Sequence, residues 1–146
     1  MKAERPLLGF LGALLCALPV APLTWLLVRH GLFLGLTGVL GFLLALGGYR
    51  LLGRRCSGLG YALAVPLVFL ASLPGLWYGY AELVLQDNAV YGCTLAEALE
   101  LVPIVSLDPA NLGQLLWDLG SILLPELLTA ILTARCLRLR RMEKQA

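Results

Sequence analysis

The sequence predicts an all-α, polytopic membrane protein with four transmembrane helices and one short, external amphipathic helix in the membrane interface. Of its 146 residues, 60% are hydrophobic and 14% are charged, whereas charged residues make up about a quarter of a typical soluble domain. The charges are also segregated, because every Lys and Arg falls in residues 2–55 or 135–144, while residues 56–134 hold seven acids and no basic residue. We therefore expect one integral membrane domain over residues 1–146.

Four apolar stretches are long enough to cross a hydrocarbon core of about 30 Å as helices, which takes about 20 residues. Three of them are uncharged runs, at residues 6–28, 31–49 and 56–81. The fourth run, residues 112–134, is interrupted only by Gln114, Asp118 and Glu126. The predicted spans are 7–28, 31–50, 57–81 and 112–136, and residues 82–111 form an external segment.

The first span has an alternative, because a secretory signal peptide also begins with basic residues and continues with an apolar core. The run is longer than a typical signal core, and its best small-residue site places Pro19 and Pro22 where cleavage would occur. We therefore favour a retained membrane span that these two prolines kink.

The placement of basic residues predicts the orientation of the spans. Residues 2–5, 50–55 and 135–144 contain every Lys and Arg except Arg29, and basic residues accumulate on the cytoplasmic side. Trp25, Trp77 and Trp117 fall at the opposite ends of their spans, where amphipathic rings favour the headgroup level. We expect a multi-pass protein of the cell (cytoplasmic) membrane, with both termini cytoplasmic.

The external segment contains a short predicted helix over residues 94–102. Thr94 and Glu97 have the spacing of a capping box, which satisfies two free backbone donors at a helix start. The apolar face, which we expect to lie on the membrane interface, is formed by Leu95, Ala98, Leu99 and Val102. Pro103 is predicted to limit this helix, and Asp108 and Pro109 to begin the last one as its cap and first residue.

Two acids lie in the last span at different predicted depths. Asp118 is expected near the water boundary as an interfacial acid, solvated or paired with Arg29, with a functional role as the alternative. Glu126 is about 12 Å deeper by helical rise. An acid at that depth is costly, so we expect it to face the bundle and to be protonated or hydrogen-bonded.

Hydroxyl side chains of the other spans fall close to the predicted depth of Glu126, and we predict a polar layer of Thr24, Thr37, Ser72 and Glu126. Two interpretations of this layer stay open. It can be a set of interhelical hydrogen bonds that fixes the register of the helices, or it can be a site for a solute or a proton.

Small residues form a stripe on the second span, where Gly31 and Gly35 have the small-xxx-small spacing that lets helices approach closely. Gly38, Gly41, Ala45 and Gly48 extend the stripe. We expect it to pack the first two spans as a hairpin, with self-association as the alternative.

The residues that most chemistry requires are sparse. The four cysteines contain no CxxC pair and His30 is the only histidine, so we expect no metal site and no cofactor. No nucleotide loop, nucleophile elbow or HExxH motif is present, and we expect no enzymatic activity. A net charge of +2 gives no reason to expect nucleic-acid binding.

The chain resembles a group of small, uncharacterised bacterial four-span integral membrane proteins. The resemblance is carried by GFLGALLCALP (residues 9–19), GGYRLLGRR (47–55), TLAEALELVP (94–103) and DPANLGQLLWDLG (108–120). It implies no activity that can be transferred. We expect an accessory or structural subunit that binds the bilayer and another membrane protein or a second copy. The alternative is a small oligomeric transporter or channel that uses Glu126.

Overall fold

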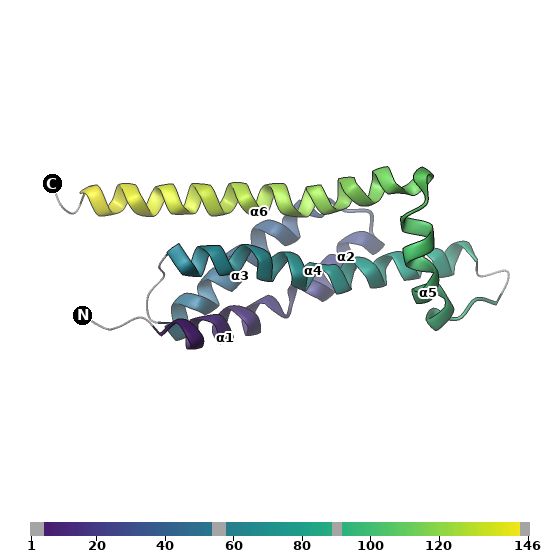
Figure 1. Cartoon of the computed structure of the whole chain (residues 1–146), viewed down its shortest axis with the longest axis horizontal. Helices are drawn as coiled ribbons and strands as arrows, with labels where there is room; N and C mark the ends of the chain where they lie inside the picture. The colour runs from purple at the N-terminus through teal and green to yellow at the C-terminus, as the bar shows by residue number, and fades with distance from the viewer. Residues whose placement is uncertain (1–4, 54–57, 89–91, 144–146) are drawn as a thin grey trace.

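The computed structural model describes residues 5–53, 58–88 and 92–143, and it is built from helices, with no strand in these ranges (Figure 1). The helices, in chain order, are α1 (Pro6–Ala17), α2 (Val20–Arg29), α3 (Gly35–Gly53), α4 (Gly58–Asp87), α5 (Leu95–Ser106) and α6 (Pro109–Glu143). The start of α1 and the end of α6 lie at one end of the long axis, and α5 crosses the other end (Figure 1).

Four stretches are long and apolar enough to cross a membrane, which indicates a multi-pass membrane protein. They are Pro6–Arg29, Gly35–Gly53, Gly60–Asp87 and Pro109–Cys136. The first consists of α1 and α2, which are separated by a break at Leu18 and Pro19. The third continues to Asp87, so the first residues of the predicted external segment are helical.

The second span begins at Gly35 and not at residue 31, because Gly31 ends the helix before it. Gly31 has a φ of 61°, a conformation that glycine adopts at no steric cost. Its N–H donates to the carbonyl of Val28 (3.0 Å) and the N–H of Leu32 donates to that of Leu27 (2.8 Å), which is the Schellman pattern of a helix C-terminus. A Cβ at Gly31 would meet no atom within 4 Å. Gly31 therefore packs against no other helix in the described part of the chain, contrary to the prediction of a hairpin contact, and the alternative of self-association stays a prediction.

Glycines set the close helix contacts, in which α1 packs mainly on α3, α2 on α4 and α6 on α3. A Cβ at Gly12 of α1 would lie 2.2 Å from the carbonyl oxygen of Gly48 on α3. One at Gly75 of α4 would lie 2.0 Å from that of Ala21 on α2. Neither position can hold a side chain without separating the backbones, so these glycines fix the distance between the spans.

Helix α5 begins with the capping box that the sequence predicts, because Thr94 Oγ1 accepts from the Glu97 N–H and Glu97 accepts from the Thr94 N–H (2.8 Å). The helix runs to Ser106 with Pro103 inside it, so the prediction that Pro103 limits it is wrong. The N–H of Leu107 donates to the carbonyl of Pro103 (3.1 Å). That bond continues the helical hydrogen-bonding past the proline. Pro103 has no backbone N–H to donate, but its carbonyl still accepts.

The buried face of α5 packs on α4, with Ala98 and Val102 against Ala81 and Val84. Leu95 and Leu99 also pack against this cluster, so all four residues of the face that the sequence assigns to the membrane interface contact protein. The location of α5 in an interface stays a prediction.

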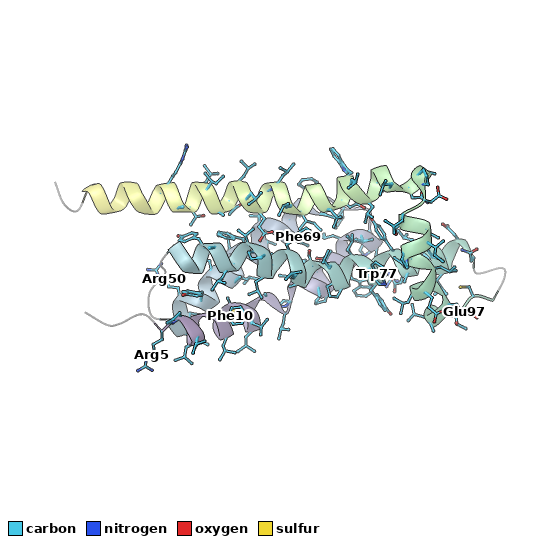
Figure 2. The ribbon with its side chains drawn as sticks, viewed as in Figure 1. Arg5, Phe10, Arg50, Phe69, Trp77 and Glu97 are labelled. Carbon is cyan, nitrogen blue, oxygen red and sulfur yellow. The ribbon has the colours of Figure 1, made fainter. Side chains whose placement is uncertain are left out.

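Charged residues differ between the two ends of the bundle. Arg5 and Arg50 lie at one end and Glu97 at the other (Figure 2). Four further basic residues from which the orientation of the spans is predicted lie outside the described residues, namely Lys2, Arg54, Arg55 and Lys144. The sidedness of the chain stays a prediction.

Candidate functional site

Glu126 lies in the contact between α3 and α6, and its side chain is 0% exposed. Helix α6 can approach α3 here because Gly38 has no side chain. A Cβ at Gly38 would lie 2.2 Å from the carbonyl oxygen of Ile122 and 3.2 Å from the Cβ of Glu126. Pro125 continues this contact, since its Cγ would be 3.0 Å from a Cβ at Gly35. The acid is thus held against a glycine surface and away from lipid.

Both carboxyl oxygens of Glu126 are buried without a hydrogen-bond partner in the described part of the chain. A buried polar group without a partner costs about 1–3 kcal/mol, and a buried charge costs more. The neutral acid is therefore the less costly form in this site. An acid that brings no compensating bond has no packing advantage over a leucine.

The three predicted hydroxyl partners are also fully buried, but each donates to a backbone carbonyl three or four residues before it. Thr24 donates to the carbonyl of Val20 (2.8 Å), Thr37 to that of Leu34 (2.6 Å) and Ser72 to that of Phe69 (2.7 Å). The structure thus places Thr24, Thr37 and Ser72 in the interior without a hydrogen bond to the acid. The local carbonyls compete successfully for the hydroxyls, and the predicted polar layer of these residues with Glu126 stays a prediction.

Asp118, the predicted interfacial acid, lies two turns before Glu126 on α6 and is half-buried. Its Oδ2 accepts from the hydroxyl of Tyr80 (2.5 Å) and its Oδ1 from the amide of Gln114 (2.9 Å). These donors are neutral. No ion pair joins Asp118 to Arg29 in the described structure, and Arg29 lies over the ring of Trp25, 5.6 Å from its centroid.

Arg29 and Asp118 nevertheless face one hollow of about 680 Å³, which we call the polar groove. The turn between α2 and α3 forms one wall, α6 a second, and α4 contributes Tyr80 and Leu83. The groove is lined by Val28, Arg29, Gly31, Leu32, Phe33, Leu34, Tyr80, Leu83, Gln114, Trp117, Asp118 and Ser121. It does not reach Glu126, since the buried Ile122 packs with Leu34 beneath it.

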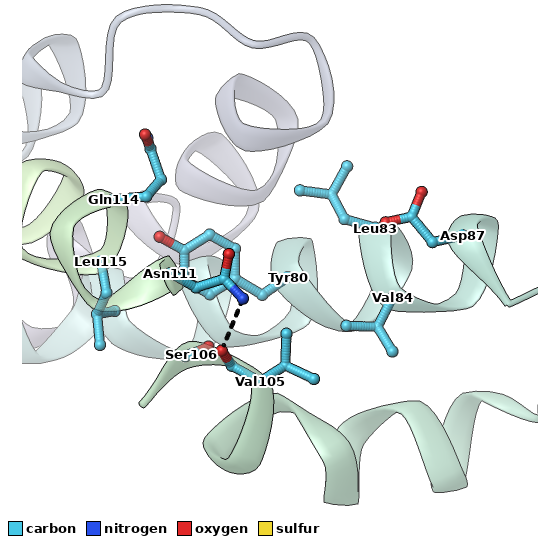
Figure 3. Close-up of a pocket in the computed structure, with 9 residues that line it drawn as sticks. All are labelled: Tyr80, Leu83, Val84, Asp87, Val105, Ser106, Asn111, Gln114 and Leu115. Carbon is cyan, nitrogen blue, oxygen red and sulfur yellow. Dashed lines mark hydrogen bonds between the residues drawn. The ribbon is translucent and has the colours of Figure 1, made fainter. Parts of the chain in front are cut away.

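A second, smaller cavity of about 200 Å³ adjoins the groove between α4, α5 and the start of α6. Figure 3 shows its lining, which includes Asp87 and Ser106, with the amide of Asn111 donating to the carbonyl of Val105 (3.1 Å). Tyr80, Leu83 and Gln114 line both hollows. The two hollows are therefore neighbours that share these three side chains.

The predicted packing residues of the second span contact different helices. Gly35 and Gly38 lie against residues of α6. Ala45 lies in the core with Ala13 and Val68. Ala13 belongs to the first span, and the two spans also meet where Gly12 lies against Gly48. Sequence reasoning missed Gly12, Gly75 and Gly79, although small residues in a span are the signal that could have indicated them.

The described residues contain no group of three or more His, Cys, Asp or Glu side chains that could hold a metal ion. No protein-family model, no curated protein and no solved structure matches the chain. The resemblance to small four-span bacterial proteins therefore stays a prediction.

Proposed function

We propose that the chain is a non-enzymatic accessory or structural subunit of a bacterial cytoplasmic membrane, with both termini cytoplasmic, and that α6 contacts its partner. The observation that supports this proposal is the poor coverage of α6 by its own chain. Only 11% of its most apolar stretch is buried, against 33–44% in the other three spans. The part that packs on α3 includes Ile122, Pro125 and Glu126.

The uncovered face of α6 has the spacing of a helix-packing seam. Leu124, Leu128, Ile131 and Leu132 are all more than half exposed and lie at i, i+4, i+7 and i+8. This spacing places them on one stripe that can interdigitate with a neighbouring helix. A helix of another membrane protein fits such a surface, with a second copy of this chain as the alternative.

Site-specific photocross-linking in native membranes tests the proposal. A photoreactive residue at Leu124, Leu128 or Leu132 is expected to give one discrete heteromeric adduct. The equally exposed Leu15 on α1 serves as the control, and it should give none. Equal yields from α6 and α1 would show that both faces meet only lipid and passing proteins, and an adduct at twice the mass of the chain would indicate a homo-oligomer.

A second candidate function is a small oligomeric transporter or channel that uses Glu126. The observation that favours it is the fully buried carboxyl group without a partner, since intramembrane ionisable groups often mark ion or proton pathways. Proton flux into liposomes containing the purified chain tests it. Glu126→Gln should abolish the flux and Glu97→Gln on α5 should leave it unchanged, whereas equal flux from all three proteins removes the candidate.

A further inference from the structure

The polar groove holds two opposite charges that do not pair with each other. Arg29 is exposed and Asp118 is half-buried, and both line the groove, Arg29 from the end of α2 and Asp118 from α6. Tyr80 and Gln114 hydrogen-bond the carboxylate but leave its charge uncompensated. The ring of Trp25 likewise leaves the guanidinium charge uncompensated. Each charge is therefore open to a ligand group of the opposite sign.

The aromatic residues around the groove place it at the level of lipid headgroups. Trp25 packs edge-on against Tyr78, with ring centroids 6.0 Å apart, and its indole N–H donates to Glu82 (2.9 Å). Trp117 lines the groove and is 69% exposed. Such rings with one apolar and one polar side favour the boundary between hydrocarbon and water.

We infer that the polar groove binds the headgroup of an aminophospholipid of the bilayer, such as phosphatidylethanolamine. The phosphate fits Arg29, whose planar guanidinium can donate two parallel hydrogen bonds to it. The primary ammonium fits Asp118, because each carboxylate oxygen keeps a free lone pair beside its present hydrogen bond. The headgroup thereby neutralises both charges of the groove.

The remaining lining suits the rest of the lipid. Leu32 and Phe33 line the groove and are more than half exposed, so they offer an apolar path for the acyl chains beside the headgroup. The volume of about 680 Å³ falls within the range of about 300–1,000 Å³ that is usual for small-molecule sites. A choline headgroup fits less well, because a quaternary ammonium has no N–H to donate to Asp118.

Native mass spectrometry of the full chain, released from nanodiscs of equal phosphatidylethanolamine, phosphatidylcholine and phosphatidylglycerol, tests the inference. The wild-type chain should retain one phosphatidylethanolamine in preference to the other two lipids. Asp118→Asn should remove that preference, whereas Arg29→Gln should weaken retention of all three lipids by about fivefold, as expected for one partly exposed charge pair. Arg50→Gln removes an exposed cation at the other end of the bundle (Figure 2) and should change nothing.

Several outcomes overturn the inference. They are no lipid preference in the wild type, an unchanged preference in Asp118→Asn, or an equal loss in Arg50→Gln. Displacement of the bound lipid by soluble glycerophosphoethanolamine at comparable concentration would identify a site for a free zwitterion. If Asp118→Asn does not fold, Ser121→Phe narrows the groove beside Asp118 without a charge change and should weaken lipid retention, and unchanged retention there also refutes the site.

Discussion

Replacing Gly38 with alanine should destabilise the bundle by separating α6 from α3. A Cβ at this position would lie 2.2 Å from the carbonyl oxygen of Ile122, whereas Cβ atoms essentially never approach other atoms within 3.0 Å. The two backbones therefore have to part by about 0.8 Å, and a gap of that size removes roughly a quarter to a half of the dispersion energy along the contact. Overpacking of this kind costs about 1–3 kcal/mol.

Alanine also has a higher helix propensity than glycine, and this offsets up to about 1 kcal/mol of the overpacking cost. Gly47 provides the matched control, because it lies on the same helix and a Cβ there would meet nothing within 4 Å. Gly47→Ala should thus be neutral or gain up to about 1 kcal/mol, and Gly38→Ala should lose about 0–2 kcal/mol net, which leaves it about 1–3 kcal/mol less stable than Gly47→Ala. Reversible unfolding in mixed micelles, followed by tryptophan fluorescence, gives both values. Equal midpoints for the two variants would refute the assignment of Gly38 as the contact point.

Three further predictions concern single residues. Glu126→Leu should raise the free energy of unfolding by about 1–3 kcal/mol, because it removes an unpartnered buried polar group; a loss of stability in the same micelle assay would mean that the acid holds the fold together. Gly31→Ala should cost about 1–2 kcal/mol through its left-handed backbone alone, since a Cβ there meets no atom within 4 Å, and Gly31→Asn should cost less; equal losses in thermal unfolding would contradict this. The pKa of Glu97 is lowered by hydrogen bonds from the backbone and then the side chain of Thr94, so its stabilising effect on α5 is present above the pKa of an unfolded glutamate and is lost as pH falls through the lower folded pKa. The Thr94 amide resonance should report that loss by NMR and should stay constant in Glu97→Gln.

Local signals were predictable from the sequence because neighbouring residues determine them. Thr94 with Glu97 forms its capping box, and Asp108 accepts from the N–H of Ala110 (2.9 Å) as the cap before Pro109. Gly31 was misassigned because two local patterns compete there. Its spacing to later glycines suggests packing, while the basic residues before it indicate a helix end.

The site was harder to predict because its parts are distant in the chain. The depth of Glu126 follows from counting residues, and the structure buries it completely. The sequence does not predict that Glu126 lacks a hydrogen-bond partner. That depends on which acceptors the hydroxyls of Thr24, Thr37 and Ser72 bond in the folded chain. The polar groove brings Arg29 and Asp118 to one hollow, and no periodicity within a single span relates two residues so far apart.

The break in the first span has a consequence for how the protein assembles during synthesis. Helix α1 packs mainly on α3, but α2 packs mainly on α4, so one span has its two halves matched to different neighbours. Because α3 precedes α4 in the chain, the main partner of α1 is synthesised before the main partner of α2. The break at Leu18 and Pro19 therefore allows the α1 half of the span to dock independently of the α2 half. A straight first helix would couple the two docking events, and it would delay the first until the second became possible.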